Sequence, residues 1–209
     1  MARPRLTFSR LFGLDRSAPP PPETRAGAPL RPWTIPNAIG FTRLALIPVF
    51  LVIALSSRDG TTTTAALLFA TIAWLDYADG IAARLTGQYS RLGTLLDPVA
   101  DRLLVVSGVV VCWHFDLLPR WALAVLALRE VAIVVLVRVG LRHGMDIAVN
   151  WPGRLAVWPV MSAIFAALVG WSTLAEVLLY TGLVLALASL AMYVRDGVRF
   201  AAARRQRSS

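Results

Sequence analysis

Four aspartates within 26 residues, Asp76, Asp79, Asp97 and Asp101, are the side chains of this sequence best suited to chemistry. The first pair is three residues apart and the second four apart, so on helices each pair shares one face. Grouped carboxylate oxygens favour Mg²⁺ or Mn²⁺, with Ca²⁺ as a further option, and the lack of Cys and His among them disfavours zinc. Two such ions would clamp a phosphoryl group.

Two apolar segments must position these aspartates. The segments 62–83 and 92–113 are predicted to be helices joined by a short turn that contains Gly87, and a short connection makes the helices antiparallel neighbours. The four carboxylates are therefore expected to converge where the helices meet the turn. A role in offsetting the helix dipole would explain Asp97 or Asp101 at a helix start, but not acidic residues at a helix end.

Small residues lie between the two acidic pairs. Gly80, Ala83 and Gly93 are expected to leave a slot beside the carboxylates, in which a flat group can lie against the backbone. Close packing of membrane helices through small residues is the alternative explanation, and both can hold together. Arg84 is expected at the rim of this slot, where it can pair with a phosphate.

The composition indicates an integral membrane protein. Apolar residues form 57% of the 209-residue chain and charged residues 16%, whereas a soluble domain carries about 25% charged residues. The mean hydropathy of +0.64 excludes disorder over most of the chain, and a single cysteine excludes a disulfide scaffold. The net charge is +9, and all 21 basic residues are Arg. Their concentration in the tails and short loops favours contact with anionic lipid, so no nucleic-acid partner is expected.

Six apolar segments are long enough to span a bilayer, some with interruptions. The fold class predicted from them is an all-α membrane protein of six transmembrane helices, at residues 39–57, 62–83, 92–113, 119–141, 153–171 and 174–194. Arg residues gather in both tails and in alternate loops, which places both termini and the aspartates on the cytoplasmic side of the cell membrane.

The remaining segments give the domain limits. Residues 1–32 are interpreted as a cytoplasmic tail with a short interfacial amphipathic helix at 6–14 and a Pro-rich linker. Residues 33–199 form the six-helix domain, and residues 200–209 form a basic C-terminal tail.

The spacing from Asp76 to Asp101 resembles the signature of the CDP-alcohol phosphatidyltransferases. Eight fixed positions of that signature match without a gap: Asp76, Asp79, Gly80, Ala83, Arg84, Gly93, Asp97 and Asp101. The resemblance implies an enzyme in which an alcohol attacks a CDP-linked lipid and releases CMP. It also implies dependence on Mg²⁺ or Mn²⁺, with two metal ions, and a homodimer among membrane lipids.

The same resemblance implies roles for individual residues. Asp76, Asp79, Asp97 and Asp101 would hold the metals, and Asp101 would also be the general base. The CDP-diacylglycerol would contact two residues of the first span and four of the signature, namely Asn37, Arg43, Gly80, Ala83, Arg84 and Gly93.

The acceptor alcohol is predicted from weaker similarities. Residues 35–43, Arg129 with Glu130, and Gly153 with Arg154 resemble segments of phosphatidylglycerophosphate synthases, although Ala156 and Val157 replace a usual Lys-Thr. This resemblance implies glycerol 3-phosphate as the acceptor. A phosphorylated acceptor needs cations apart from the metal site, and three arginines are expected to supply them: Arg91, Arg129 and Arg154. A cardiolipin synthase, which uses phosphatidylglycerol, is the alternative, and a phosphatidylinositol-phosphate synthase ranks lower.

Two other classes fit the aspartates less well. A polyprenyl transferase needs a second, distant acidic cluster, which this sequence lacks. An ion transporter is expected to place its ions at the middle of the membrane on broken helices, whereas these aspartates are predicted near one interface.

Overall fold

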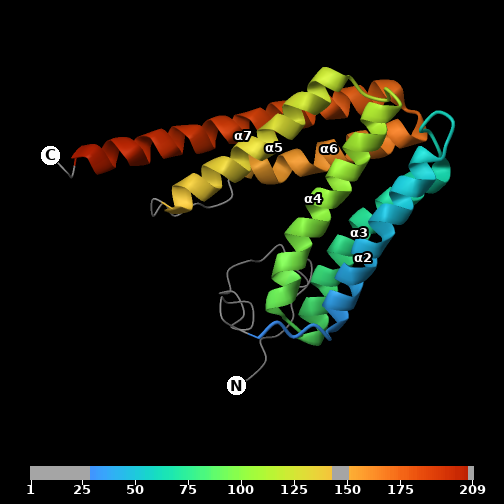
Figure 1. The fold of residues 1–209 in the computed structure, drawn as a ribbon, viewed down its shortest axis with the longest axis horizontal. Coiled ribbons are helices and arrows are strands. Elements are labelled where there is room, and N and C mark those ends of the chain that lie inside the picture. The colour runs from blue at the N-terminus through green and yellow to red at the C-terminus, as the bar shows by residue number, and fades with distance from the viewer. Residues whose placement is uncertain (1–28, 143–150, 207–209) are drawn as a thin grey trace. The chain divides into compact units, whose positions relative to one another are not determined.

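The computed structural model describes residues 29–142 and 151–206, and in this part of the chain all regular secondary structure is α-helical, without strands. Six helices follow one another through it (Figure 1). Their bounds are α2 Ile35–Leu55, α3 Thr63–Thr86, α4 Arg91–His114, α5 Arg120–Arg142, α6 Trp151–Val169 and α7 Ser172–Gln206.

The predicted all-α class is confirmed, and each of the six predicted segments overlaps one helix. Three helical segments of the described residues are long and apolar enough to cross a membrane, Ile35–Leu55, Thr63–Thr86 and Ser172–Arg199. Leu155–Val169 in α6 is apolar but shorter. Charged residues interrupt α4 and α5, as the sequence already indicates. The amphipathic helix predicted at 6–14 lies outside the described residues.

The ends of the helices follow from local sequence. Thr34 caps α2, because its side-chain oxygen accepts a hydrogen bond from the Asn37 backbone N–H, and Pro36 occupies the first turn, where it costs no hydrogen bond. The turn between α3 and α4 contains Gly87 with a φ of 66°, a backbone conformation that glycine adopts without steric cost. This turn makes α3 and α4 an antiparallel hairpin.

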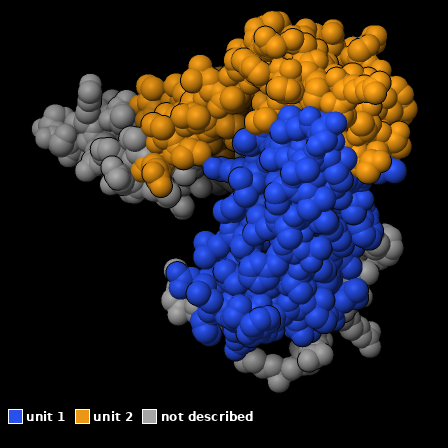
Figure 2. Space-filling view, turned by 45° about the vertical axis from the view of Figure 1, so that its right-hand side comes forward, with its two compact units in different colours: residues 1–56, 67–108 blue, residues 57–66, 109–209 orange. Residues whose placement is uncertain are grey.

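The chain divides into two compact units (Figure 2). The first unit contains α2, most of α3 and the first part of α4, within residues 1–56 and 67–108. Phe50 of α2 packs against Phe69 of α3 with the ring centroids 5.5 Å apart, and both side chains are buried. Gly40 of α2 faces Leu96 of α4. Within this unit, α2 therefore contacts both α3 and α4.

The second unit comprises residues 57–66 and 109–209, with α5, α6 and α7. α7 runs along both α5 and α6. Trp121 of α5 stacks on Tyr180 of α7 with the ring centroids 5.8 Å apart. Gly182 of α7 meets α6 closely: a Cβ at this position would lie 2.6 Å from Cγ2 of Val160 and 3.1 Å from its backbone nitrogen. A side chain on Gly182 would therefore separate α6 from α7.

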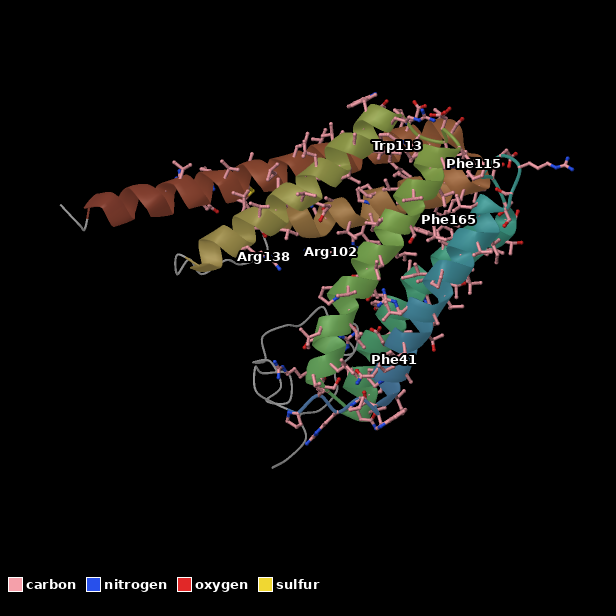
Figure 3. All side chains as sticks on the ribbon, viewed as in Figure 1. Phe41, Arg102, Trp113, Phe115, Arg138 and Phe165 are labelled. Carbon is pink, nitrogen blue, oxygen red and sulfur yellow. The ribbon has the colours of Figure 1, made fainter. Side chains whose placement is uncertain are left out.

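Large apolar side chains cover much of the surface. Phe41 on α2 and Trp113 on α4 are examples of exposed aromatic residues (Figure 3), and Trp158 on α6 is 73% exposed. Soluble monomers rarely expose this much apolar surface, because its contact with water is unfavourable. The surface therefore agrees with helices that face lipid.

We expect Gly182→Ala to lower the stability of the protein. The added methyl would press against Val160, whose β-branched side chain has little rotational freedom, at a cost of about 1–3 kcal/mol. Gly197→Ala on the same helix is the matched control, because nothing lies within 4 Å of its Cβ position. Thermal unfolding in detergent should show a lower midpoint for Gly182→Ala alone. Equal midpoints for the two variants would contradict the close packing of α6 on α7.

Candidate active site

The four aspartates lie on the α3–α4 hairpin at two matching levels. Asp76 stands ten residues before the end of α3 at Thr86, and Asp101 ten residues after the start of α4 at Arg91. Asp79 and Asp97 form the second level, nearer the turn. The carboxylates thus lie about two to three helical turns inside the helix ends, which is deeper than the positions next to the turn that the sequence suggested.

Arg43 of α2 brings three of these carboxylates together. Its Nη1 donates a hydrogen bond to Asp76 Oδ1 at 2.7 Å and a longer one to Asp79 Oδ2 at 3.4 Å. Its Nη2 donates to Asp101 Oδ1 at 2.6 Å, and its Nε donates to the backbone oxygen of Ile72 at 3.3 Å. One guanidinium therefore joins α2, α3 and α4.

Asp97 belongs to the same cluster through electrostatics. Charge repulsion links it to Asp79, Asp76 and Asp101. Four carboxylates thus share a small volume with a single guanidinium, which cannot neutralise four negative charges when all are ionised. The cluster retains a strong attraction for further cations.

The cluster has a buried side and an accessible side. The Arg43 side chain is fully buried and that of Asp79 is 8% exposed, whereas those of Asp76 and Asp101 are 41% and 42% exposed. A substrate or an ion approaching from outside would therefore reach Asp76 and Asp101 before Asp79.

The donor set suits a hard divalent cation. Carboxylate oxygens are the ligands that Mg²⁺ and Mn²⁺ prefer, and the surplus negative charge would stabilise a bound cation. Within residues 29–142 and 151–206, however, no three acidic, Cys or His side chains have the arrangement of a metal-binding group. Arg43 instead donates to three of the four carboxylates. The residues fit a metal in chemistry and charge, while their present arrangement is organised by Arg43.

Asn37 and Gly93 are both predicted to contact the lipid nucleotide. They lie together near the α3–α4 turn. Asn37 is buried, and its Nδ2 donates to the backbone oxygens of Arg31 and Pro32 at 2.9 and 3.1 Å. Its Oδ1 accepts a hydrogen bond from Ser90 Oγ at 2.8 Å, and Ser90 Oγ accepts one from the Gly93 N–H at 2.9 Å. The Asn37 side chain therefore ties the start of α2 to the start of α4.

Gly93 allows this contact. A Cβ at position 93 would lie 2.9 Å from Asn37 Oδ1 and 3.2 Å from Ser90 Oγ, which is too close for an unstrained contact. The slot predicted beside Gly93 is thus filled by the Asn37 and Ser90 side chains in this structure. The predicted contacts of Asn37 and Gly93 with the lipid stay predictions.

Gly80, Ala83 and Arg84 follow Asp79 on α3, as the sequence indicates. The Arg84 guanidinium lies over Gly80, with Nη2 3.4 Å from the position of a Cβ there. Gly80 and Ala83 are partly buried. These three residues share the first unit with the aspartates.

The three arginines predicted to bind the acceptor fall in different parts of the chain. Arg91 is the first residue of α4, in the unit that holds the aspartates. Arg129 of α5 lies in the second unit, where its Nε donates to the backbone oxygen of Ala186 at 3.1 Å and its Nη1 pairs with Glu130. Arg154 is in the first turn of α6, and its side chain lies outside the described residues. A common acceptor pocket therefore stays a prediction.

Sequence reasoning missed two features of this site. It did not identify Ser90, although a Ser three residues before Gly93 at the start of an apolar helix is typical of an N-cap. It also did not identify the pairing of Arg43 with the aspartates, and the predicted contact of Arg43 with the lipid nucleotide stays a prediction. An arginine within an apolar span requires an acidic partner, and that rule would have indicated the pairing.

Comparison with known proteins adds to this geometry. The family described as CDP-alcohol phosphatidyltransferase matches residues 33–188. A CDP-diacylglycerol–glycerol-3-phosphate 3-phosphatidyltransferase of Bacillus subtilis is 32% identical over 148 residues, which are 65% of this chain and 77% of that protein.

Two further relatives differ from each other in the activity that their names state. A cardiolipin synthase (CMP-forming) of Streptomyces coelicolor is 39% identical over 137 residues, 64% of each chain. A probable phosphatidylglycerophosphate synthase of Mycobacterium tuberculosis is 32% identical over 123 residues, 57% of this chain and 58% of that protein. The matched region thus spans less than two thirds of the Streptomyces and Mycobacterium proteins.

We expect Gly93→Ala to destabilise the protein by about 1–3 kcal/mol, because the new methyl displaces Asn37 Oδ1 and Ser90 Oγ. The same change in an Asn37→Ala background should cost clearly less, since the nearer of the two displaced atoms, Asn37 Oδ1, is then absent. A double-mutant cycle measured by thermal unfolding gives this coupling. Equal costs in the two backgrounds would contradict the packing of Gly93 on Asn37.

Proposed function

Because this chain belongs to the CDP-alcohol phosphatidyltransferase family, we propose that it transfers a phosphatidyl group from CDP-diacylglycerol to glycerol 3-phosphate and releases CMP. Family membership makes the chain a transferase that joins a CDP-linked phosphatidyl group to an alcohol. The identity of the acceptor, the roles of single residues and the arrangement in the membrane are the parts proposed here.

The observation that carries the proposal is the convergence of the aspartates. Asp76, Asp79 and Asp101 contact one guanidinium, and Asp97 lies within their electrostatic range. Four carboxylates gathered around one guanidinium leave an excess of negative charge between apolar helices, which costs stability unless further cations bind. Such a cluster on the hairpin that carries the family signature supports a catalytic use.

In the proposed enzyme Asp76, Asp79, Asp97 and Asp101 hold Mg²⁺ or Mn²⁺. Bound there, the metal supplies positive charge that neutralises the pyrophosphate and the departing CMP. Arg84, which lies over Gly80 on the same helix, is placed to pair with a phosphate of the nucleotide. Gly80 and Ala83 present little side chain, so the cytidine can approach the backbone of α3.

The reaction step needs a proton acceptor. The acceptor hydroxyl oxygen forms a bond to the phosphorus of the phosphatidyl group, and the bond from that phosphorus to the CMP oxygen breaks, with its electron pair leaving on CMP. The hydroxyl proton passes to Asp101, whose side chain is accessible enough to meet a substrate. Asp79 is buried against Arg43, so in the proposed enzyme it acts as a metal ligand and does not contact the acceptor.

Two observations support glycerol 3-phosphate as the acceptor. The name of the Bacillus relative includes that substrate, and this chain covers 77% of that protein. The proposed acceptor is itself an anion, and the sequence provides Arg91, Arg129 and Arg154 outside the acidic cluster. The Streptomyces relative favours a second candidate, a cardiolipin synthase that uses phosphatidylglycerol.

The proposed membrane arrangement follows the charge pattern. Residues 33–199 form the catalytic domain, with six spanning helices in the cell membrane and both tails in the cytoplasm. The aspartates then face the cytoplasm, where CDP-linked and phosphorylated substrates are available. We place the enzyme as a homodimer among membrane lipids, as the family resemblance implies.

Purified protein in detergent, given CDP-diacylglycerol, Mn²⁺ and radiolabelled glycerol 3-phosphate, should release CMP and produce labelled phosphatidylglycerophosphate. The measurement is thin-layer separation of the labelled lipid together with CMP quantification. A parallel reaction with phosphatidylglycerol should yield no cardiolipin. Cardiolipin formation without incorporation of label would replace the proposed acceptor by the second candidate.

Asp97→Asn should reduce CMP release by about 10³-fold or more, because it removes a ligand charge from the cluster without changing the shape of the side chain. Asp196→Asn is the matched control, because this aspartate is exposed on α7, away from the cluster in sequence, and forms an ion pair with its neighbour Arg195. We expect the control to keep wild-type turnover. Retained activity in Asp97→Asn would remove this residue from the metal site.

A further inference from the structure

Arg43 contacts three of the four aspartates, but the reaction proposed above assigns it no role. We propose that Arg43 is a positioning residue: its guanidinium is the internal counter-cation of the acidic cluster when no divalent metal is bound, and it competes with the metal for the same oxygens. This inference rests on the metal ligands proposed above.

The geometry fixes the guanidinium in this place. Nε donates to the Ile72 backbone oxygen of α3 at 3.3 Å, which orients the planar group. Nη1 and Nη2 then point at Asp76 and Asp101 with contacts of 2.7 and 2.6 Å. The side chain is fully buried, so water cannot replace these partners. Each nitrogen of the guanidinium is committed to α3 or α4.

The positive charge of the Arg43 guanidinium compensates the negative charges of the carboxylates around it. Without Arg43, the three carboxylates that it contacts would lose their shared positive partner and would repel one another and Asp97. Removing one member of a buried charge group is strongly destabilising, because the remaining charges stay uncompensated. Arg43 therefore keeps α2, α3 and α4 together before any metal arrives.

The same contacts predict competition. Asp76 Oδ1 and Asp101 Oδ1 accept the two shortest hydrogen bonds of Arg43, and both residues are proposed metal ligands. A positive charge beside these oxygens repels an incoming cation. Removal of the Arg43 charge should therefore weaken the metal-free protein and strengthen its binding of metal, two effects of opposite sign that loss of packing alone would not produce.

Thermal unfolding of the full chain in detergent tests the first effect. In EDTA, Arg43→Gln should unfold about 10 °C below wild type, and saturating Mg²⁺ should recover more than half of that loss. Arg129→Gln is the matched control, because Arg129 is also a largely buried arginine with a carboxylate partner and a backbone acceptor but lies in the second unit. Its loss of stability should be the same in EDTA and in Mg²⁺.

Mn²⁺ binding measured by electron paramagnetic resonance tests the second effect. Arg43→Gln should reach half-saturation at an about tenfold lower Mn²⁺ concentration than wild type. Arg43→Lys keeps the charge and loses the planar fork, so it should bind Mn²⁺ as wild type does and unfold at an intermediate temperature in EDTA. If Arg43→Gln does not fold, Arg43→Lys still tests the inference, because tighter Mn²⁺ binding by this charge-retaining variant than by wild type would overturn it.

The outcomes separate the inference from the proposed function. Weaker or unchanged Mn²⁺ binding in Arg43→Gln, or equal gains in unfolding temperature with Mg²⁺ for wild type and variant, would overturn the role of Arg43 and leave the metal site standing. Absence of Mn²⁺ binding to wild type and both variants would overturn the metal ligands and the inference together.

Discussion

The contact of one buried guanidinium with three carboxylates is the constraint on which the first unit depends. Arg43 crosses from α2 to Asp76 and Asp79 on α3 and to Asp101 on α4. In an apolar setting such charges are stable only when paired. The positions of α2, α3 and α4 relative to one another are therefore set by electrostatics at this level, and by apolar contacts such as Phe50 with Phe69 further along the helices.

A second, neutral connection holds the same helices nearer the turn. Asn37 joins the start of α2 to Ser90, and Ser90 caps α4 through the Gly93 N–H. Gln88 adds a further contact, because its Oε1 accepts a hydrogen bond from the Ile35 N–H at 2.9 Å. These contacts use backbone groups that a helix end leaves without partners. The hairpin that carries the aspartates is thus fixed both at its turn and at the level of the acids, which suits a site that must hold four carboxylates in register.

Each unit contains a buried arginine that links helices, but the two arginines differ in the number of carboxylates around them. Arg129 holds α5 to α7 through the Ala186 backbone oxygen and pairs with a single carboxylate, Glu130. Its charge is balanced one to one. Around Arg43 the acids exceed the base by three, and that excess is what makes the first unit attractive to cations. The imbalance of charge, more than the presence of buried ions, distinguishes the candidate active site from an ordinary structural ion pair.

The sequence by itself determined the helical class, the six helical segments and the family, because apolar segment length and the spacing from Asp76 to Asp101 are local properties. The i, i+3 and i, i+4 spacings also placed each acidic pair on one helix face. Only the tertiary structure decided that Arg43 belongs to the aspartates and that Asn37 packs on Gly93. These contacts join residues 33 to 58 positions apart, and such pairings depend on how the helices pack, which local spacing does not encode.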